Sequence, residues 1–171
     1  MRRYFYDTEF HEKPNTIDLI SIGIVGEHGE RFYKVSSDFD LEAAEQNDWI
    51  KENVLKRLPP KYLWESNRSI RNAVRGCLRP SKEDPVELWG YYSSYDHVAL
   101  CWLFGPMVDL PEGMPMFTRD IKQLAVQLGN PMLPRQAKGK HDALEDARHN
   151  KVMYDFLKKG YKDGTFKFTF S

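Results

Sequence analysis

The stretch that most constrains this fold is Tyr4–Phe10, in which aromatic residues surround two carboxylates spaced two positions apart. Aromatic residues favour strands, and the side chains of a strand alternate between its two faces, so Asp7 and Glu9 project from the same face. Two ionised carboxylates side by side repel each other, and burying both is unfavourable without a compensating positive charge. Hard divalent cations such as Mg²⁺ prefer oxygen ligands. The strand is therefore predicted to form the base of a metal site.

The composition indicates a folded chain, which we interpret as a single domain spanning residues 1–171. Lys and Arg together number 25, as do Asp and Glu, so polyanion binding requires a local basic patch. The two cysteines, Cys77 and Cys101, provide neither a disulfide framework nor a zinc-binding spacing, which fits a reducing compartment. No long apolar run is present, so we expect no signal peptide, no membrane association and a cytoplasmic location.

The order of apolar patterns predicts an α/β fold. Three strands joined by short connections, at residues 4–10, 17–25 and 31–35, indicate an antiparallel meander. A fourth, buried strand is expected at residues 86–92, between helical segments, which favours a mixed sheet. The predicted helices span residues 41–58, 96–104 and 118–128, with one more from residue 66 or 69 to 78 and a last one from residue 141 or 142 to 159. Gly160 is predicted to end the last helix, and residues 162–171 are expected to form a short strand or a tail.

A second group of candidate residues lies at the start of the last predicted helix. Asp142 is predicted to be its N-cap, with Glu145 three residues later resembling a capping box. This assignment puts His141 and Asp146 at the two positions whose side chains meet in a hydrophobic staple. Since these residues are an imidazole and a carboxylate, capping would bring a titratable base beside a potential metal ligand. A surface ion pair is the alternative interpretation.

A third candidate is Asp96, which follows the fourth predicted strand where the chain turns into a helix. This position suits an N-cap, although side chains at such strand ends also project into ligand clefts. Taken alone, capping is the simpler interpretation. Asp120 also lies at a predicted helix start, where the favourable interaction of a negative charge with the helix N-terminus explains it without a catalytic role.

Taken in chain order, these motifs resemble the DEDDh group of ribonuclease-H-like 3′-5′ exonucleases. The segments Asp7–Phe10, Tyr95–Leu100 and His141–Arg148 are most similar to its branch of mycobacterial polyadenylate-specific 3′-exoribonucleases. The resemblance extends from the first strand through the last helix. It implies a ribonuclease-H-like fold, with a central mixed sheet of an antiparallel three-strand meander plus parallel strands, flanked by α-helices.

The resemblance also implies a mechanism. Asp7, Glu9, Asp96 and Asp146 would hold two Mg²⁺ or Mn²⁺ ions, and His141 would accept the proton of the attacking water. The implied activity is a metal-dependent 3′-5′ exoribonuclease that releases nucleoside 5′-monophosphates from single-stranded RNA. Relatives of this kind are often homodimers, so a homodimer is included among the expectations.

Five residues near these motifs are candidate substrate contacts. Phe10 and Tyr95 are expected to stack on or wall the terminal base, with two core aromatics as the alternative. Arg135 and Lys138, in the loop before His141, are interpreted as a phosphate-steering patch, with a solvated basic loop as the alternative. Thr8, between the two acids of the first strand, completes the set.

Other functions compete with this interpretation. No residue identifies a reader of the ribose 2′-hydroxyl, so a 3′-5′ exodeoxyribonuclease or an oligonucleotide-trimming nuclease could use the same site. A non-catalytic nucleic-acid-binding module is disfavoured, because binding alone would not need the complete set of acids and histidine. A serine hydrolase of the α/β class is set aside, because the sequence contains no Gly-x-Ser-x-Gly motif.

Overall fold

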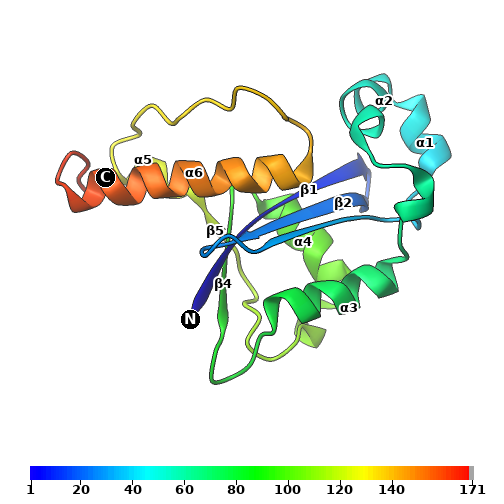
Figure 1. Cartoon of the computed structure of the whole chain (residues 1–171), viewed down its shortest axis with the longest axis horizontal. Coiled ribbons are helices and arrows are strands. Elements are labelled where there is room, and N and C mark those ends of the chain that lie inside the picture. The colour runs from blue at the N-terminus through cyan, green and yellow to red at the C-terminus, as the bar shows by residue number, and fades with distance from the viewer. Residues whose placement is uncertain (170–171) are drawn as a thin grey trace.

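The computed structural model of the chain describes residues 1–169, and these contain a five-stranded sheet in the order β3-β2-β1-β4-β5 (Figure 1). The sheet is mixed, because β1 to β3 are antiparallel whereas β4 runs parallel to β1 and β5 parallel to β4. This arrangement confirms the predicted meander with added parallel strands. The strands are β1 (Arg2–Lys13), β2 (Thr16–Gly26), β3 (Arg31–Val35), β4 (Val86–Gly90) and β5 (Arg119–Asp120).

Helices cover both faces of the sheet. Tyr4 and Tyr6 of β1 pack in one core with α3 (Asn67–Leu78) and α4 (Ser94–Trp102). Phe5, on the opposite face, packs in a second core with two further helices, its ring centroid 5.2 Å from that of Tyr154. Burial of each such aromatic side chain stabilises the fold by roughly 1.5–3 kcal/mol. The helices on this second face are α5 (Ile121–Gln127) and α6 (Ala143–Lys162).

The prediction of one continuous helix over residues 41–58 is wrong. The segment forms two short helices, α1 (Leu41–Gln46) and α2 (Asp48–Asn53), followed by the 3₁₀ turn η1 (Leu55–Arg57). Asn47 separates them, because its backbone is extended and its side chain accepts a hydrogen bond from the backbone N–H of Ile50. Asn competes with helical hydrogen bonding in this way and is favoured as an N-cap. We call residues 41–57 the helical lobe.

The helical lobe is anchored on the sheet by a third core. Ile50 and Val54 are buried together with Ile20 of β2 and Phe39, so the apolar spacing that suggested a long helix still marks the buried side. Figure 1 shows the lobe at the end of the sheet toward which the N-terminus of α6 points. Two further 3₁₀ turns, η2 (Lys61–Leu63) and η3 (Met107–Asp109), lie in the connections.

The C-terminal boundary of α6 also differs from the expectation. The helix continues through Gly160, which is buried, and ends at Lys162. A Cβ atom on Gly160 would lie 2.1 Å from the ring of Phe166, so this glycine permits close packing and does not end the helix. Residues 163–169 form turns and an extended segment without a strand, and residues 170–171 of the predicted strand or tail lie outside the described part.

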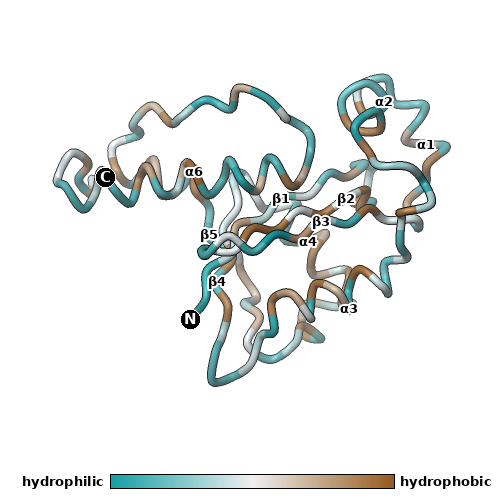
Figure 2. The backbone as a smooth tube through the Cα atoms, viewed as in Figure 1, coloured by the Kyte–Doolittle hydropathy of each residue, from teal (hydrophilic) through white to brown (hydrophobic). Residues whose placement is uncertain are grey.

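Hydropathy follows this architecture. In Figure 2 the hydrophobic segments are concentrated in the central strands, whereas the helical lobe and α6 carry many hydrophilic positions. No helix within residues 1–169 has the length and apolar character needed to cross a membrane.

Candidate active site

The two acids of β1 lie on the face that α6 covers. Phe5, Asp7 and Glu9 alternate onto this face, and Asp7 lines a cavity together with Asp146 and Asn150 of α6. Pairing between β1 and β4 ends at Phe5 and Trp89. Beyond this point Asn150 Nδ2 donates a hydrogen bond of 3.0 Å to the carbonyl of Tyr6, which holds α6 against the strand beside Asp7.

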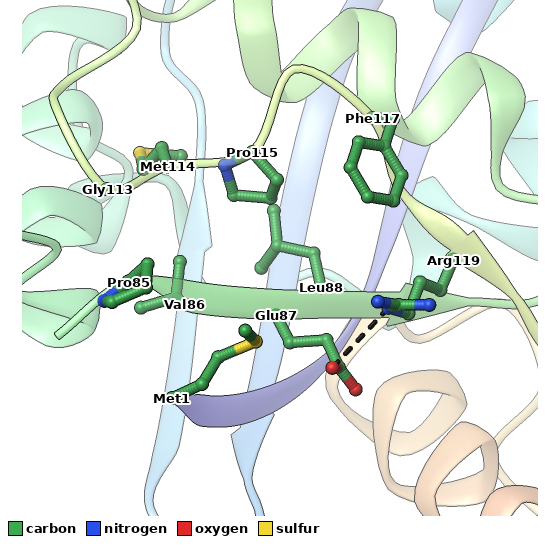
Figure 3. Close-up of a pocket in the computed structure, with 10 residues that line it drawn as sticks. All are labelled: Met1, Pro85, Val86, Glu87, Leu88, Gly113, Met114, Pro115, Phe117 and Arg119. Carbon is green, nitrogen blue, oxygen red and sulfur yellow. Dashed lines mark ion pairs between the residues drawn. The ribbon is translucent and has the colours of Figure 1, made fainter. Parts of the chain in front are cut away.

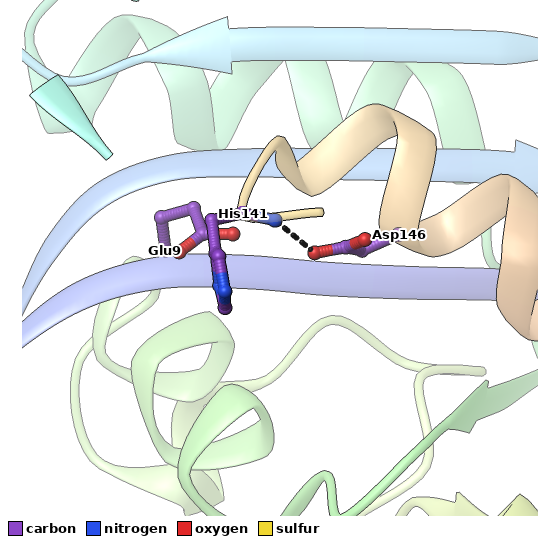
Figure 4. A group of neighbouring side chains, drawn as sticks. All are labelled: Glu9, His141 and Asp146. Carbon is purple, nitrogen blue, oxygen red and sulfur yellow. Dashed lines mark hydrogen bonds between the residues drawn. The ribbon is translucent and has the colours of Figure 1, made fainter. Parts of the chain in front are cut away.

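The start of α6 brings the second motif to these acids. Asp142 is the N-cap, as predicted, and accepts hydrogen bonds from the backbone N–H groups of Leu144 and Glu145 at 3.0 and 3.1 Å. The backbone N–H of His141 donates to Asp146 Oδ2 at 2.8 Å (Figure 4). Capping therefore places the histidine beside the carboxylate, as expected, although the bond between them comes from the main chain.

Glu9, His141 and Asp146 are neighbours at the start of α6 (Figure 4). One potential ligand atom from each of the three lies within 4.8 Å of the others. Carboxylate oxygens and an imidazole nitrogen are donors that suit divalent metals such as Mg²⁺ and Mn²⁺. Asp7 and Asp96 are not members of this three-residue group. Asp7 lines the same cavity as His141 and Asp146, and Asp96 is bonded to Thr8, the residue between Asp7 and Glu9.

Asp96 is held by Thr8 and does not cap a helix. The N-cap of α4 is Ser93, and Asp96 lies in the first turn of the helix, so the capping interpretation is wrong. Its Oδ1 atom accepts two hydrogen bonds of 2.7 Å, one from the backbone N–H and one from the hydroxyl of Thr8. Because both residues are buried, this contact fixes the orientation of the Asp96 carboxylate beside β1. Asp120, by contrast, lies at a helix start, as predicted, although α5 begins at Ile121 instead of residue 118 and Asp120 is its N-cap.

The buried acids have pKa values above the ordinary range. Removal from water, followed by repulsion from Asp146 and Asp96, raises the pKa of Glu9 to about 8. Burial and then the charge of Asp96 raise the pKa of Asp7 well above its usual value. Burial also raises the pKa of Asp96 to about 6, against the hydrogen bonds from Thr8, which favour ionisation. A cluster of acids in which ionisation is unfavourable is one that a bound divalent cation would stabilise.

Three residues of this region were not predicted from the sequence. Gln136 Nε2 donates a hydrogen bond of 2.6 Å to Asp146 Oδ1, so both oxygens of that carboxylate have partners. In the helical lobe, the positive charge of Arg57 lowers the pKa of Glu9 in opposition to burial, and the ring of Trp49 lies 4.8 Å from that of His141. Sequence reasoning had no signal for these contacts, because they depend on the break at Asn47 and on the path of a loop.

The candidate substrate contacts form an aromatic pair and an exposed basic loop. Phe10 and Tyr95 form a T-shaped pair with ring centroids 6.0 Å apart, and the Tyr95 side chain is 47 % exposed. Neither residue belongs to any of the three buried cores. Arg135 and Lys138 are exposed in the loop of residues 130–140 between α5 and α6.

The parallel strands have a cavity at each end. The first, of about 450 Å³, opens beside the catalytic region and is lined by Asp7, His141, Asp146 and residues of the loop before α6. The second, of about 230 Å³, lies at the N-terminal ends of β1 and β4 (Figure 3). It is mainly apolar, apart from Glu87 and Arg119, which form an ion pair of 3.4 Å. Since ligands of α/β sheets bind at the C-terminal ends of parallel strands, the first cavity is the candidate substrate site.

Comparisons with known structures show the same architecture. E. coli exonuclease I in complex with a dA16 oligonucleotide superimposes with a TM-score of 0.65 at 13 % identity, over 92 % of this chain and 41 % of that chain. The complex of the same enzyme with dT13 gives a TM-score of 0.62 at 12 % identity, over 96 % and 42 % of the two chains. This chain thus spans less than half the length of exonuclease I, and the likeness shows a shared ribonuclease-H-like fold.

Comparison with known sequences gives the family. The 3′-5′ exoribonuclease Rv2179c-like domain matches residues 2–157. The chain is 49 % identical over 148 residues to the 3′-5′ exoribonuclease Rv2179c of Mycobacterium tuberculosis (strain ATCC 25618 / H37Rv), covering 85 % of this chain and 87 % of the relative. The 3′-5′ exoribonuclease MT2234.1 of strain CDC 1551 / Oshkosh matches with the same identity and coverage. Given matches of this extent, the chain belongs to the Rv2179c-like family of 3′-5′ exoribonucleases.

Proposed function

We propose that this 3′-5′ exoribonuclease removes nucleoside 5′-monophosphates from single-stranded RNA, and that Asp7, Glu9, Asp96 and Asp146 hold two Mg²⁺ or Mn²⁺ ions. The observation that carries the proposal is the convergence of Glu9, His141 and Asp146, from β1 and the start of α6, within 4.8 Å. Bound divalent ions would supply a more acidic water and stabilise the leaving 3′-oxygen. The raised pKa values of Glu9 and Asp96 support the assignment, because they reflect a site short of positive charge.

The remaining roles follow from the contacts of each residue. His141 accepts the proton of the attacking water at its imidazole, the side chain that most often acts as a general base. Asp146 is oriented by hydrogen bonds from Gln136 and from the main chain of His141. Thr8 orients Asp96 through its hydroxyl and its backbone N–H, and its direct contact with substrate stays a prediction.

Phe10 follows Glu9 in the chain and pairs with the exposed ring of Tyr95, which precedes Asp96, and such a pair suits stacking on an unpaired base of any identity. Arg135 and Lys138 are free to meet the phosphates of the approaching strand. RNA is favoured as the substrate by the family, whereas the solved complexes of exonuclease I contain DNA oligonucleotides. Activity on DNA or on very short oligonucleotides is therefore the second candidate. The single domain, the homodimer and the cytoplasmic location stay predictions.

The test is 3′-end shortening of 5′-labelled single-stranded RNA and DNA of one sequence, with Mg²⁺ or Mn²⁺. Asp7→Asn and His141→Ala should each reduce kcat by at least about a hundredfold, the usual size of a general-base or metal-ligand contribution. Glu112→Gln, at an exposed acid outside the cluster, is the control and should match the wild-type protein. Unchanged activity in Asp7→Asn would overturn the metal-site assignment, and the ratio of RNA to DNA cleavage decides the substrate.

A further inference from the structure

The imidazole of His141 contacts the indole of Trp49, which comes from a different part of the chain. The two rings are 4.8 Å apart between centroids and inclined at 78°, an edge-to-face arrangement. Aromatic rings prefer this geometry because the positive edge of one meets the negative face of the other. The contact joins the helical lobe to the start of α6 across the catalytic region.

Little else fixes the orientation of the imidazole. The backbone of His141 has a φ of 63°, a left-handed conformation that is unfavourable for a residue with a Cβ atom. Its N–H is held by Asp146, but within residues 1–169 neither nitrogen of the ring has a hydrogen-bonding partner. Histidines that act as general bases are usually oriented by a third group. Here the group in contact with the ring is an indole.

Packing alone does not explain the position of Trp49. Its side chain is 53 % exposed and lies outside the three buried cores. The next residue, Ile50, is by contrast buried in the core that anchors the helical lobe. The Asn47 cap fixes the start of α2, and Ile50 anchors the helix on β2. These two contacts make α2 a rigid support that presents the indole to His141.

We propose that Trp49 is a positioning residue, which restricts the ring of His141 to the orientation needed to accept the proton of the attacking water. This inference rests on the proposed role of His141 as general base. The contact persists whichever ring supplies the edge, because either arrangement restricts rotation of the imidazole about its Cα–Cβ and Cβ–Cγ bonds. Trp49 thereby couples the helical lobe to catalysis without touching the reacting phosphate.

A double-mutant cycle tests this proposal on single-stranded RNA, with Trp49→Ala, His141→Ala and the two combined. Trp49→Ala should lower kcat about tenfold while KM stays within about twofold, because positioning acts on the chemical step. In the His141→Ala background the same substitution should have no further effect. Trp49→Phe should recover most of the activity, whereas Trp49→Leu, of similar apolar character without a ring, should not.

Two controls separate positioning from other roles. Trp102→Ala removes an indole that is similarly exposed, at 50 %, and should leave activity unchanged. An RNA whose 3′-terminal residue is abasic should show the same tenfold loss with Trp49→Ala, because no terminal base is involved. If the loss disappears with that substrate, or appears in KM alone, Trp49 binds a base and the proposal is wrong.

The cycle also distinguishes failure of the inference from failure of the proposed mechanism. Equal losses from Trp49→Ala in the presence and absence of His141 would overturn the positioning role while leaving the general base in place. Wild-type activity in His141→Ala would instead overturn the general-base assignment itself. Thermal unfolding of each variant shows whether the loss arises from the chemical step or from an unfolded lobe.

Discussion

Gly23 of β2 lies so close to the first residue of α6 that a Cβ atom on it would be 2.2 Å from the carbonyl oxygen of Ala143. In the register of the sheet, Gly23 is the partner of Asp7. The N-terminus of α6 can therefore descend onto the sheet only where β2 has no side chain. This close approach is what brings His141 and Asp146 to the acids of β1.

Gly23→Ala should accordingly damage both stability and activity. The added methyl group forces α6 away from β2, and overpacking of this kind costs about 1–3 kcal/mol. Activity of the folded protein should fall by about tenfold or more, because displacement of catalytic groups by roughly 1 Å is costly. Urea unfolding and exonuclease assays measure the two effects.

Gly76→Ala is the matched control, because a Cβ atom there would meet nothing within 4 Å. Gly76 lies within α3, where alanine is favoured over glycine by about 1 kcal/mol, so this variant should be more stable and fully active. A Gly23→Ala variant as active and stable as the wild-type protein would show that α6 and β2 tolerate separation.

The basic loop makes a prediction about salt. If Arg135 and Lys138 each contact one phosphate, the double substitution Arg135→Gln/Lys138→Gln should weaken RNA binding and reduce the slope of log K against log salt by about 1.4. Binding of fluorescent single-stranded RNA to the Asp7→Asn protein, measured over a range of KCl concentrations, gives this slope. Arg31→Gln/Lys82→Gln removes two exposed charges elsewhere and should leave it unchanged. If the two double variants have equal slopes of log K against log salt, Arg135 and Lys138 do not contact the RNA phosphates.

The sequence was most informative where the signal is local. Alternation along β1 placed Asp7 and Glu9 on one face, and the N-cap at Asp142 placed His141 beside Asp146. Both patterns depend on neighbours within a few residues. The single helix predicted over residues 41–58 is wrong, although apolar residues recur at helical spacing throughout this segment. The helix is interrupted by the side chain of Asn47, which accepts a hydrogen bond from the N–H of Ile50.

Contacts between distant segments had no comparable signal. The bond from Thr8 to Asp96 joins residues 88 positions apart, and Trp49 meets His141 only after the lobe has folded onto β2. Taken alone, the position of Asp96 therefore predicts a helix cap, and only the combination of the three motifs predicts a metal ligand. The partner of Asp96 is Thr8, whose backbone N–H has no β4 residue to pair with, because the pairing of β4 with β1 ends at Phe5.

The raised pKa of Glu9 gives a pH dependence to the metal-free protein. Its pKa is about 8 in the folded chain against an ordinary value of 4.5, so between these values the folded state binds more protons than the unfolded state. The free energy of unfolding must then fall as pH rises through this window. Asp96, with a pKa of about 6, adds to the fall at the lower end.

Thermal unfolding in EDTA should therefore give a lower Tm at pH 8 than at pH 5.5. Glu9→Gln removes the titrating group, and its Tm should change less over the same range. A Tm that rises with pH in the metal-free wild-type protein would mean that the acids are ionised without a cation.

Metal binding should oppose this loss of stability at high pH. Divalent ions bind deprotonated ligands, so protons compete with them, and stabilisation by Mg²⁺ or Mn²⁺ should be larger at pH 8 than at pH 5.5. A metal concentration of about 100 times Kd stabilises the folded state by about 2.7 kcal/mol. The measurement is the difference in Tm between Mn²⁺ and EDTA at each pH. Asp146→Asn should lose most of the difference, and Glu112→Gln should keep it.

The contact between Thr8 and Asp96 should control metal affinity without contributing a ligand. Thr8→Val keeps the shape of the side chain and the backbone N–H, but it removes the hydroxyl that donates to Asp96 Oδ1. Loss of that hydrogen bond should raise the pKa of Asp96 further, since the bond favours the ionised carboxylate. Partners that orient a metal ligand typically contribute about 10–100-fold in affinity or activity.

We therefore expect Thr8→Val to need about 10–100 times more Mn²⁺ for half-maximal activity, with activity recovering at saturating metal. Thr8→Ser retains the hydroxyl and should behave as the wild-type protein does. If Thr8→Val needs no more Mn²⁺ than the wild-type protein, the hydroxyl is dispensable and the orientation of Asp96 rests on the backbone N–H alone. If instead KM for RNA rises while the metal requirement is unchanged, Thr8 contacts the substrate directly.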